Sequence, residues 1–128
     1  MARSTAVRPI FILAGLYDAV LGLAFLLFAP QVFQRFDVIP PNHFGYVRFP
    51  AMLLLVFALM FFAVAFDPKR NRNLIPYGIL LKVSYCAAVG WYWYHDPTLP
   101  MMWKPFAIID LAFLVAFIWA YRKIGTAR

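Results

Sequence analysis

Four long apolar stretches, separated by short polar segments, occupy most of this chain. They cover residues 10–29, 46–66, 74–94 and 102–121. Each holds about 20 residues, which is the length a helix needs to cross a hydrocarbon layer of about 30 Å. A backbone inside lipid must satisfy its own hydrogen bonds, so such stretches are expected to be helical. The pattern predicts an all-α protein, with four transmembrane helices forming a single membrane domain over residues 1–128.

The composition excludes an ordinary soluble domain. Hydrophobic residues make up 65% of the chain and charged residues only 13%, whereas soluble domains are about half apolar and about a quarter charged. The net charge of +7 could suggest a nucleic-acid partner. However, the basic residues lie at the ends of the apolar stretches and form no aromatic-studded basic surface segment. The expected partner is therefore the lipid bilayer, and no nucleic acid is expected.

The first apolar stretch follows a basic start, as in a secretory signal peptide. We expect it to remain as a span. Its apolar part is longer than the hydrophobic region of a usual signal peptide, and it contains Asp18. In addition, no small-x-small cleavage motif precedes Pro30. Pro30 is expected to end the first helix and Arg122-Lys123 the last span.

The connections predict how neighbouring helices are arranged. Residues 67–73 and 95–100 are short polar turns, which favour antiparallel helix pairs. The longest connection covers residues 31–48 and begins with VFQRF, a mixture of aromatic and polar residues. That mixture is typical of a helix lying at the membrane interface. We therefore expect a four-helix antiparallel bundle with a short interfacial helix between its first two spans.

The distribution of basic residues predicts the orientation of the bundle. Eight of them lie in the N-terminus, the 67–73 turn and the C-terminal tail, and three lie in the opposite connections or next to them. Since basic residues are enriched on the cytoplasmic side of membrane proteins, we expect a multi-pass protein with both termini in the cytoplasm. A reporter fused to the tail that is active outside the cell would contradict this orientation.

Three charged residues lie well inside the predicted spans, away from their ends. Lys82 is in the third, and Asp18 and Asp110 are in the first and fourth. An unpaired lysine at a helix centre costs about 2.5–3.5 kcal/mol even on lenient insertion scales, so Lys82 needs partners. Counting residues places Asp18 and Lys82 roughly 12 Å from the cytoplasmic edge and Asp110 roughly 16 Å from it. The three side chains are therefore expected to converge.

Two carboxylates beside one lysine leave a surplus negative charge, which is costly to bury. We expect one carboxyl group to be protonated, or hydrogen-bonded by Tyr17 or Tyr85. Asp110 is the expected neutral group, because phenylalanines flank it on its helix. Infrared spectra that show only ionised carboxylates at neutral pH, compared with Asp110→Asn, would contradict this hypothesis.

The charges allow three interpretations. They could hold the helices in register, or line a cavity that binds a quinone, a lipid headgroup or a proton, or Lys82 could extend toward the interface. In the second interpretation the binding residues are Asp18, Lys82, Asp110, Tyr85 and Tyr17.

Other side chains give no catalytic pattern. Ser84 has no histidine near it in the spans, and no glycine-rich phosphate loop is present. The single Cys86 excludes an intrachain disulfide and a multi-cysteine metal site. His43 and His95 fall in polar connections, where histidines are usually solvated. We predict no catalytic residue, cofactor or metal site. The balance is against an enzyme, and a membrane enzyme acting on a quinone or a lipid is the third hypothesis after the two given below.

Several segments resemble the small four-helix membrane proteins grouped as DoxX-like. They are GLYDAVLGLAFLLF in the first span, the turn DPKRNRNLI, GILLKVSY in the third span and IIDLAFLVAF in the last. The resemblance implies a bacterial inner-membrane protein, a group sometimes associated with quinone-linked or redox systems. It implies no catalytic residue. The chain departs from the redox members because it has only one cysteine.

Two functional hypotheses follow from the sequence. The first is a non-enzymatic accessory or assembly subunit of a membrane complex, with another membrane protein or a second copy as its partner. The second is a small binding or transport protein that uses the three intramembrane charges. Charged tips gathered around an open void would favour the second hypothesis, and tips sealed in tight packing would favour a purely structural role.

Overall fold

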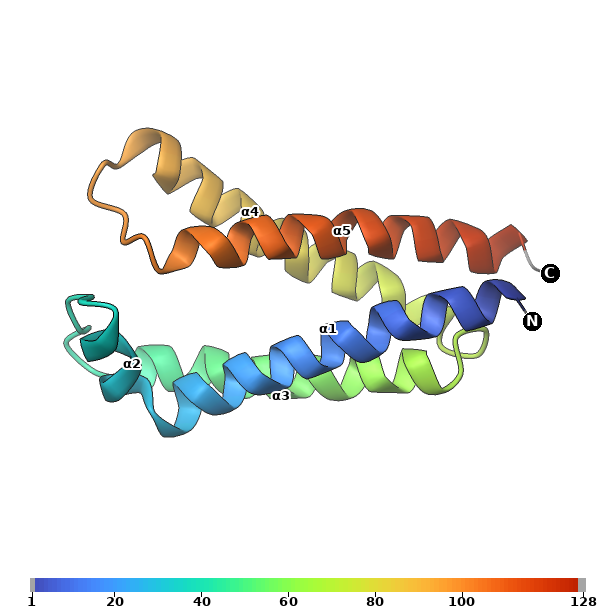
Figure 1. Ribbon diagram of the computed structural model, residues 1–128, viewed down its shortest axis with the longest axis horizontal. Coiled ribbons are helices and arrows are strands. Elements are labelled where there is room, and N and C mark those ends of the chain that lie inside the picture. The colour runs from blue at the N-terminus through green and yellow to red at the C-terminus, as the bar shows by residue number, and fades with distance from the viewer. Residues whose placement is uncertain (1, 127–128) are drawn as a thin grey trace.

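The computed structural model describes residues 2–126, and the side chains of residues 6–125. It is an all-helical bundle with four long helices (Figure 1). Each long helix contains a stretch long and apolar enough to cross a membrane. The elements are α1 (Ala2–Leu27), α2 (Ala29–Arg35), α3 (Gly45–Phe66), the 3₁₀ turn η1 (Arg72–Leu74), α4 (Ile75–His95) and α5 (Trp103–Thr126). This confirms the predicted fold class and the short helix between the first two spans.

The ends of two helices differ from the expectation. α1 begins before Pro9, contains it, and ends at Leu27. Pro30 lies in the first turn of α2, where the missing N–H removes no helical hydrogen bond. α5 continues to Thr126, past Arg122-Lys123. Charged residues limit how far a segment enters lipid, but they do not prevent the backbone hydrogen bonds of a helix from continuing into water.

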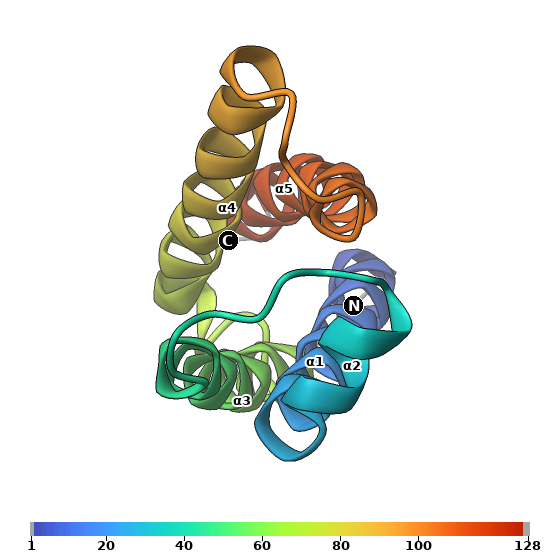
Figure 2. The ribbon, with the colours of Figure 1, turned by 90° about the vertical axis from the view of Figure 1, so that its left-hand side faces the viewer.

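The four long helices form two pairs. α1 packs along α3, α4 packs along α5, and α1 also touches α5. The chain termini and the α3–α4 connection lie at one end of the bundle, and α2 and the α4–α5 loop lie at the other (Figure 1). α4 starts beside α3 and then diverges from it, as the end-on view shows (Figure 2). The bundle is therefore closed near the termini and splayed toward α2.

Small residues explain why α1 and α3 lie so close together. Ala51, Ala58 and Ala65 recur every seven positions on α3, and all three are buried. On α1, a Cβ atom built on Gly22 would lie only 2.9 Å from the backbone oxygen of Ala51. A Cβ atom on Gly15 would similarly meet the ring of Phe62 on α3. Close backbone approach through small residues is the usual way that helices pack in membranes.

Backbone hydrogen bonds hold the start of the connection between α1 and α3. After α2, the N–H of Asp37 bonds to the oxygen of Gln34 and the N–H of Val38 to the oxygen of Phe33. Together with the left-handed φ of 58° at Asp37, these bonds form a Schellman cap, which ends the helix and turns the chain.

Two hydrophobic clusters divide the interior. The larger one lies toward the termini and includes Phe11, Phe61 and Phe117. The smaller one lies toward α2 and includes buried Phe25 and Phe33, and the side chain of Trp103 packs against it. The charged residues of the spans lie between the two clusters, at the level where the helices begin to separate.

Candidate functional site

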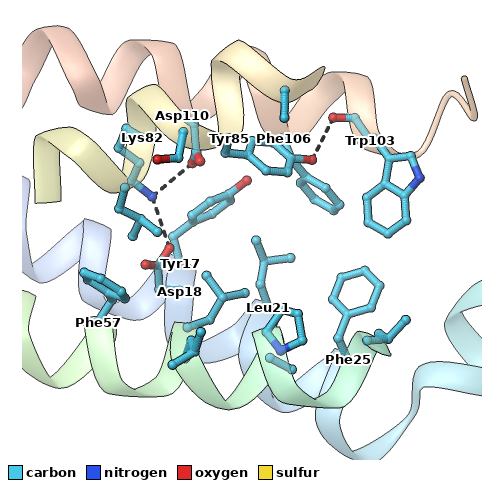
Figure 3. Close-up of a pocket in the computed structure, with 18 of the residues that line it drawn as sticks. Tyr17, Asp18, Leu21, Phe25, Phe57, Lys82, Tyr85, Trp103, Phe106 and Asp110 are labelled. Atoms are coloured by element: carbon cyan, nitrogen blue, oxygen red, sulfur yellow. Dashed lines mark hydrogen bonds and ion pairs between the residues drawn. The ribbon is translucent and has the colours of Figure 1, made fainter. Parts of the chain in front are cut away.

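The three intramembrane charges meet at one point in the bundle interior. The Nζ atom of Lys82, on α4, donates a hydrogen bond to Oδ1 of Asp18 on α1 at 3.2 Å. It donates a second bond to Oδ1 of Asp110 on α5 at 3.0 Å. Lys82 and Asp18 are each 1% exposed and Asp110 is 7% exposed. The predicted convergence is confirmed, and the charges join three of the four long helices (Figure 3).

Aromatic rings surround the ammonium group of Lys82. Its Nζ atom lies 5.4 Å from the ring centre of Phe113, and 5.6 Å from those of Tyr17 and Phe61. Such distances permit cation–π attraction, which is strongest where water is excluded. Lys82 therefore points into the bundle, and the interpretation in which it extends toward the interface is wrong.

Two polar atoms beside the cluster have no hydrogen-bond partner. Oδ2 of Asp18 and the hydroxyl of Tyr17 are both buried and unbonded. The Tyr85 hydroxyl donates instead to the backbone oxygen of Trp103 at 3.0 Å. The expectation that Tyr17 or Tyr85 hydrogen-bonds a carboxyl group is therefore wrong, because the Tyr85 hydroxyl bonds to Trp103 and the Tyr17 hydroxyl has no partner. The expectation that Asp110 is the neutral carboxyl stays a prediction.

An apolar cavity of about 600 Å³ adjoins the charged cluster. All four long helices line it, and Tyr17, Asp18, Tyr85, Lys82 and Asp110 all belong to its wall. The rest of the wall is mainly aliphatic and aromatic. Figure 3 shows the charged groups at one end of this space and Phe25 and Trp103 at the other. The cavity is thus an apolar chamber with polar groups at one end.

The cavity opens on the side where α4 leaves α3. Its wall on α3 includes Leu53, which is 42% exposed, and its wall on α4 includes exposed Ser84 and Ala88. The surfaces of the spans next to this opening are apolar. A molecule dissolved in the bilayer could therefore enter sideways, without crossing the polar ends of the bundle.

The remaining candidate residues lie away from the cluster or are engaged locally. His43 Nδ1 accepts a hydrogen bond from the N–H of Gly45, and His95 Nδ1 lies 3.0 Å from the oxygen of Trp91. The Cys86 thiol lies 3.5 Å from the backbone oxygen of Ala107. Within residues 2–126, no group of three or more histidine, cysteine or acidic residues could hold a metal ion.

The apolar wall of the cavity was not predicted from the sequence. Leu21 and Phe25 lie one and two turns beyond Asp18, and Phe106 and Trp103 lie one and two turns before Asp110. Residues three, four and seven positions apart share a helix face. The available signal was therefore the run of large side chains on the same faces as the charges, but it does not show whether they leave space between them.

No protein-family model, curated protein or solved structure shows significant similarity to this chain. The resemblance to DoxX-like proteins therefore stays a prediction.

Proposed function

We propose that this membrane protein binds a lipophilic small molecule in the cavity between its four long helices. The observation that carries the proposal is the location of the buried ion cluster. Its charged tips are gathered at the end of an open apolar space, next to a polar oxygen and a hydroxyl that lack partners. A volume of about 600 Å³ is within the usual range for small-molecule sites, which are mainly apolar with a few placed polar groups.

The polar end of the cavity favours a ligand that donates a hydrogen bond. Lys82 uses two of its donors on the aspartates, and two carboxyl groups with one ammonium leave an excess of acceptors. Oδ2 of Asp18 is a buried acceptor without a partner. A hydroxyl or amine at the end of an apolar molecule, as in a quinol or a long-chain amine, would complete this network. Since that oxygen is covered, a neighbouring side chain must move when such a group binds.

Ligand binding in the cavity corresponds to the second hypothesis from the sequence. The first hypothesis, an accessory subunit in the inner membrane, stays a prediction, and no contact among the described residues supports it as directly as the cavity supports binding. Assignment to the inner membrane, with cytoplasmic termini, rests on the resemblance and on the distribution of basic residues.

The test is to close the opening without touching the charges. Ala88 lines the cavity and is exposed, whereas its neighbour Ala87 is also exposed but does not line it. Ala88→Trp should weaken binding of decylubiquinol and dodecylamine, measured by native mass spectrometry of the full chain in detergent. Ala87→Trp is the matched control and should bind both probes normally.

Two results would contradict the proposal. Equal binding by the Ala88→Trp and Ala87→Trp variants would show that the probes do not occupy the cavity. If methyl dodecyl ether, which has no donor, binds as tightly as dodecylamine, the role given to the carboxyl groups would be wrong.

A further inference from the structure

A second pocket, of about 370 Å³, lies at the opposite end of the bundle from α2 and does not involve the charged cluster. It is formed by the α3–α4 connection and the end of α5, which lie together near the termini (Figure 1). Its lining residues are Lys69, Arg70, Arg72, Asn73, Tyr121 and Ile124. Three of these are basic and none is acidic, so the pocket has the charge that an anion requires.

Arg72 is held in a fixed position in this pocket. Its Nε atom donates to the backbone oxygen of Tyr121 at 3.0 Å, and its guanidinium carbon lies 3.7 Å from the centre of the Tyr121 ring. A guanidinium has five N–H donors in a rigid plane, and the Nε bond uses one of them. The donors on the two Nη atoms can therefore bind a phosphate group without first having to be ordered.

The connection that supplies the other two cations is also anchored. Asn71 donates from Nδ2 to the backbone oxygen of Ala63 at 2.8 Å, and the N–H of Arg70 bonds to Oδ1 of Asp67 at 3.2 Å. Asp67 is the acidic residue of this connection, and it does not line the pocket. The side chains of Lys69 and Arg70 are exposed and extend from a backbone that is held in place.

The position of the pocket indicates a lipid headgroup. Tyr121 and Ile124 lie in the last turns of the fourth candidate span, which ends at Gly125, and the connection follows the end of the second span at Phe66. Lipid phosphates lie at this level in a bilayer, and basic pockets between transmembrane helices bind anionic headgroups. The apolar side chain of Ile124 and the ring of Tyr121 give the pocket a wall suited to the non-charged part of a lipid.

We infer that this pocket binds the phosphate group of an anionic membrane lipid, with Arg72 as its fixed donor and Lys69 and Arg70 as flanking cations. The site is separate from the cavity and does not depend on the function proposed for it.

The experiment compares phosphatidylglycerol, phosphatidic acid, zwitterionic phosphatidylcholine and inorganic phosphate, by native mass spectrometry of the full chain in detergent. The first variant is the double substitution Lys69→Gln/Arg70→Gln, which changes exposed side chains only. Each basic side chain near a membrane surface strengthens the binding of an anionic lipid. Losing both should therefore weaken binding of the two anionic lipids about thirtyfold. The matched control, Arg35→Gln/Lys104→Gln, removes the same charge from the other end of the bundle and should bind them normally.

A second variant, Arg72→Lys, keeps the charge and loses the planar donor group. It should also weaken binding of both anionic lipids, and a thermal unfolding curve should show that the variant is folded. Equal loss in the Lys69→Gln/Arg70→Gln and Arg35→Gln/Lys104→Gln variants would overturn the inference, because it would show only general charge attraction. Phosphatidylcholine binding as tightly as phosphatidylglycerol would overturn it as well. Inorganic phosphate binding as tightly as phosphatidic acid would show a site for soluble anions instead of lipids.

Discussion

Replacing Lys82 with methionine should destabilise the bundle far more than replacing Asp18 with asparagine. Lys82→Met leaves two carboxyl groups, about 3 Å from the former ammonium position, buried with no counter-charge. Asp18→Asn instead leaves Lys82 with Asp110 as its acidic partner, and the two form a neutral pair once Asp110 is ionised. Both variants keep the size of the side chain nearly constant, so the comparison isolates charge.

The expected loss of stability in Lys82→Met follows from the burial of the charged groups. Removing one partner of a buried ion pair costs about 3–5 kcal/mol, because the remaining charge is neither solvated nor paired. Lys82 also loses attraction to three nearby rings, which is included in that range. For Asp18→Asn we expect a change of about 1 kcal/mol or less, since one hydrogen bond to Lys82 can be kept and the surplus acidic group is removed.

The assay is equilibrium unfolding of the full chain in mixed micelles, followed by circular dichroism and tryptophan fluorescence. A third variant removes all three charges together, with Asp18→Leu, Lys82→Met and Asp110→Leu. It should recover most of the stability lost in Lys82→Met, because apolar replacement of a whole buried ion cluster is often neutral or stabilising. It should also lose binding of dodecylamine, which separates stability from ligand binding.

The reasoning would be refuted if Asp18→Asn destabilised the protein as much as Lys82→Met. It would also be refuted if Lys82→Met unfolded with an unchanged free energy, since the ammonium would then not be compensating the buried carboxyl groups.

Two further predictions concern packing and a loop. Gly22→Ala should destabilise the bundle by about 1–3 kcal/mol through a clash with the Ala51 backbone. A Cβ atom on Gly90 meets nothing within 4 Å. Gly90→Ala should therefore be neutral or stabilising in the same unfolding assay. Hydrogen bonds from the hydroxyl and then the N–H of Thr98 lower the pKa of Asp96. The loop conformation is therefore favoured above the ordinary aspartate pKa and loses this support as pH falls through the lowered value. Thr98→Val, which keeps only the N–H, should raise the pKa of Asp96 in an NMR titration, and an unchanged value would contradict this cause.

Much of the architecture could be predicted from local sequence properties. The number of long helices follows from the length of the apolar stretches, because lipid forces each stretch to satisfy its own backbone. The antiparallel order follows from the two short turns. The meeting of Lys82 with Asp18 and Asp110 was also predictable, because their depths can be counted along helices and an isolated lysine in hydrocarbon is too costly.

The cavity was decided only by the tertiary structure. The faces that carry Leu21, Phe25 and Phe106 are visible in the sequence, but the same side chains could have packed together with no space between them. Space remains because α4 diverges from α3, and the angle between two helices depends on contacts along their whole length and not on either sequence alone. For the same reason, the stacking of Arg72 on Tyr121, residues 49 positions apart, has no local signal. Hydropathy and spacing determine where each helix lies in the membrane, and the packing of one helix against another determines what the protein can bind.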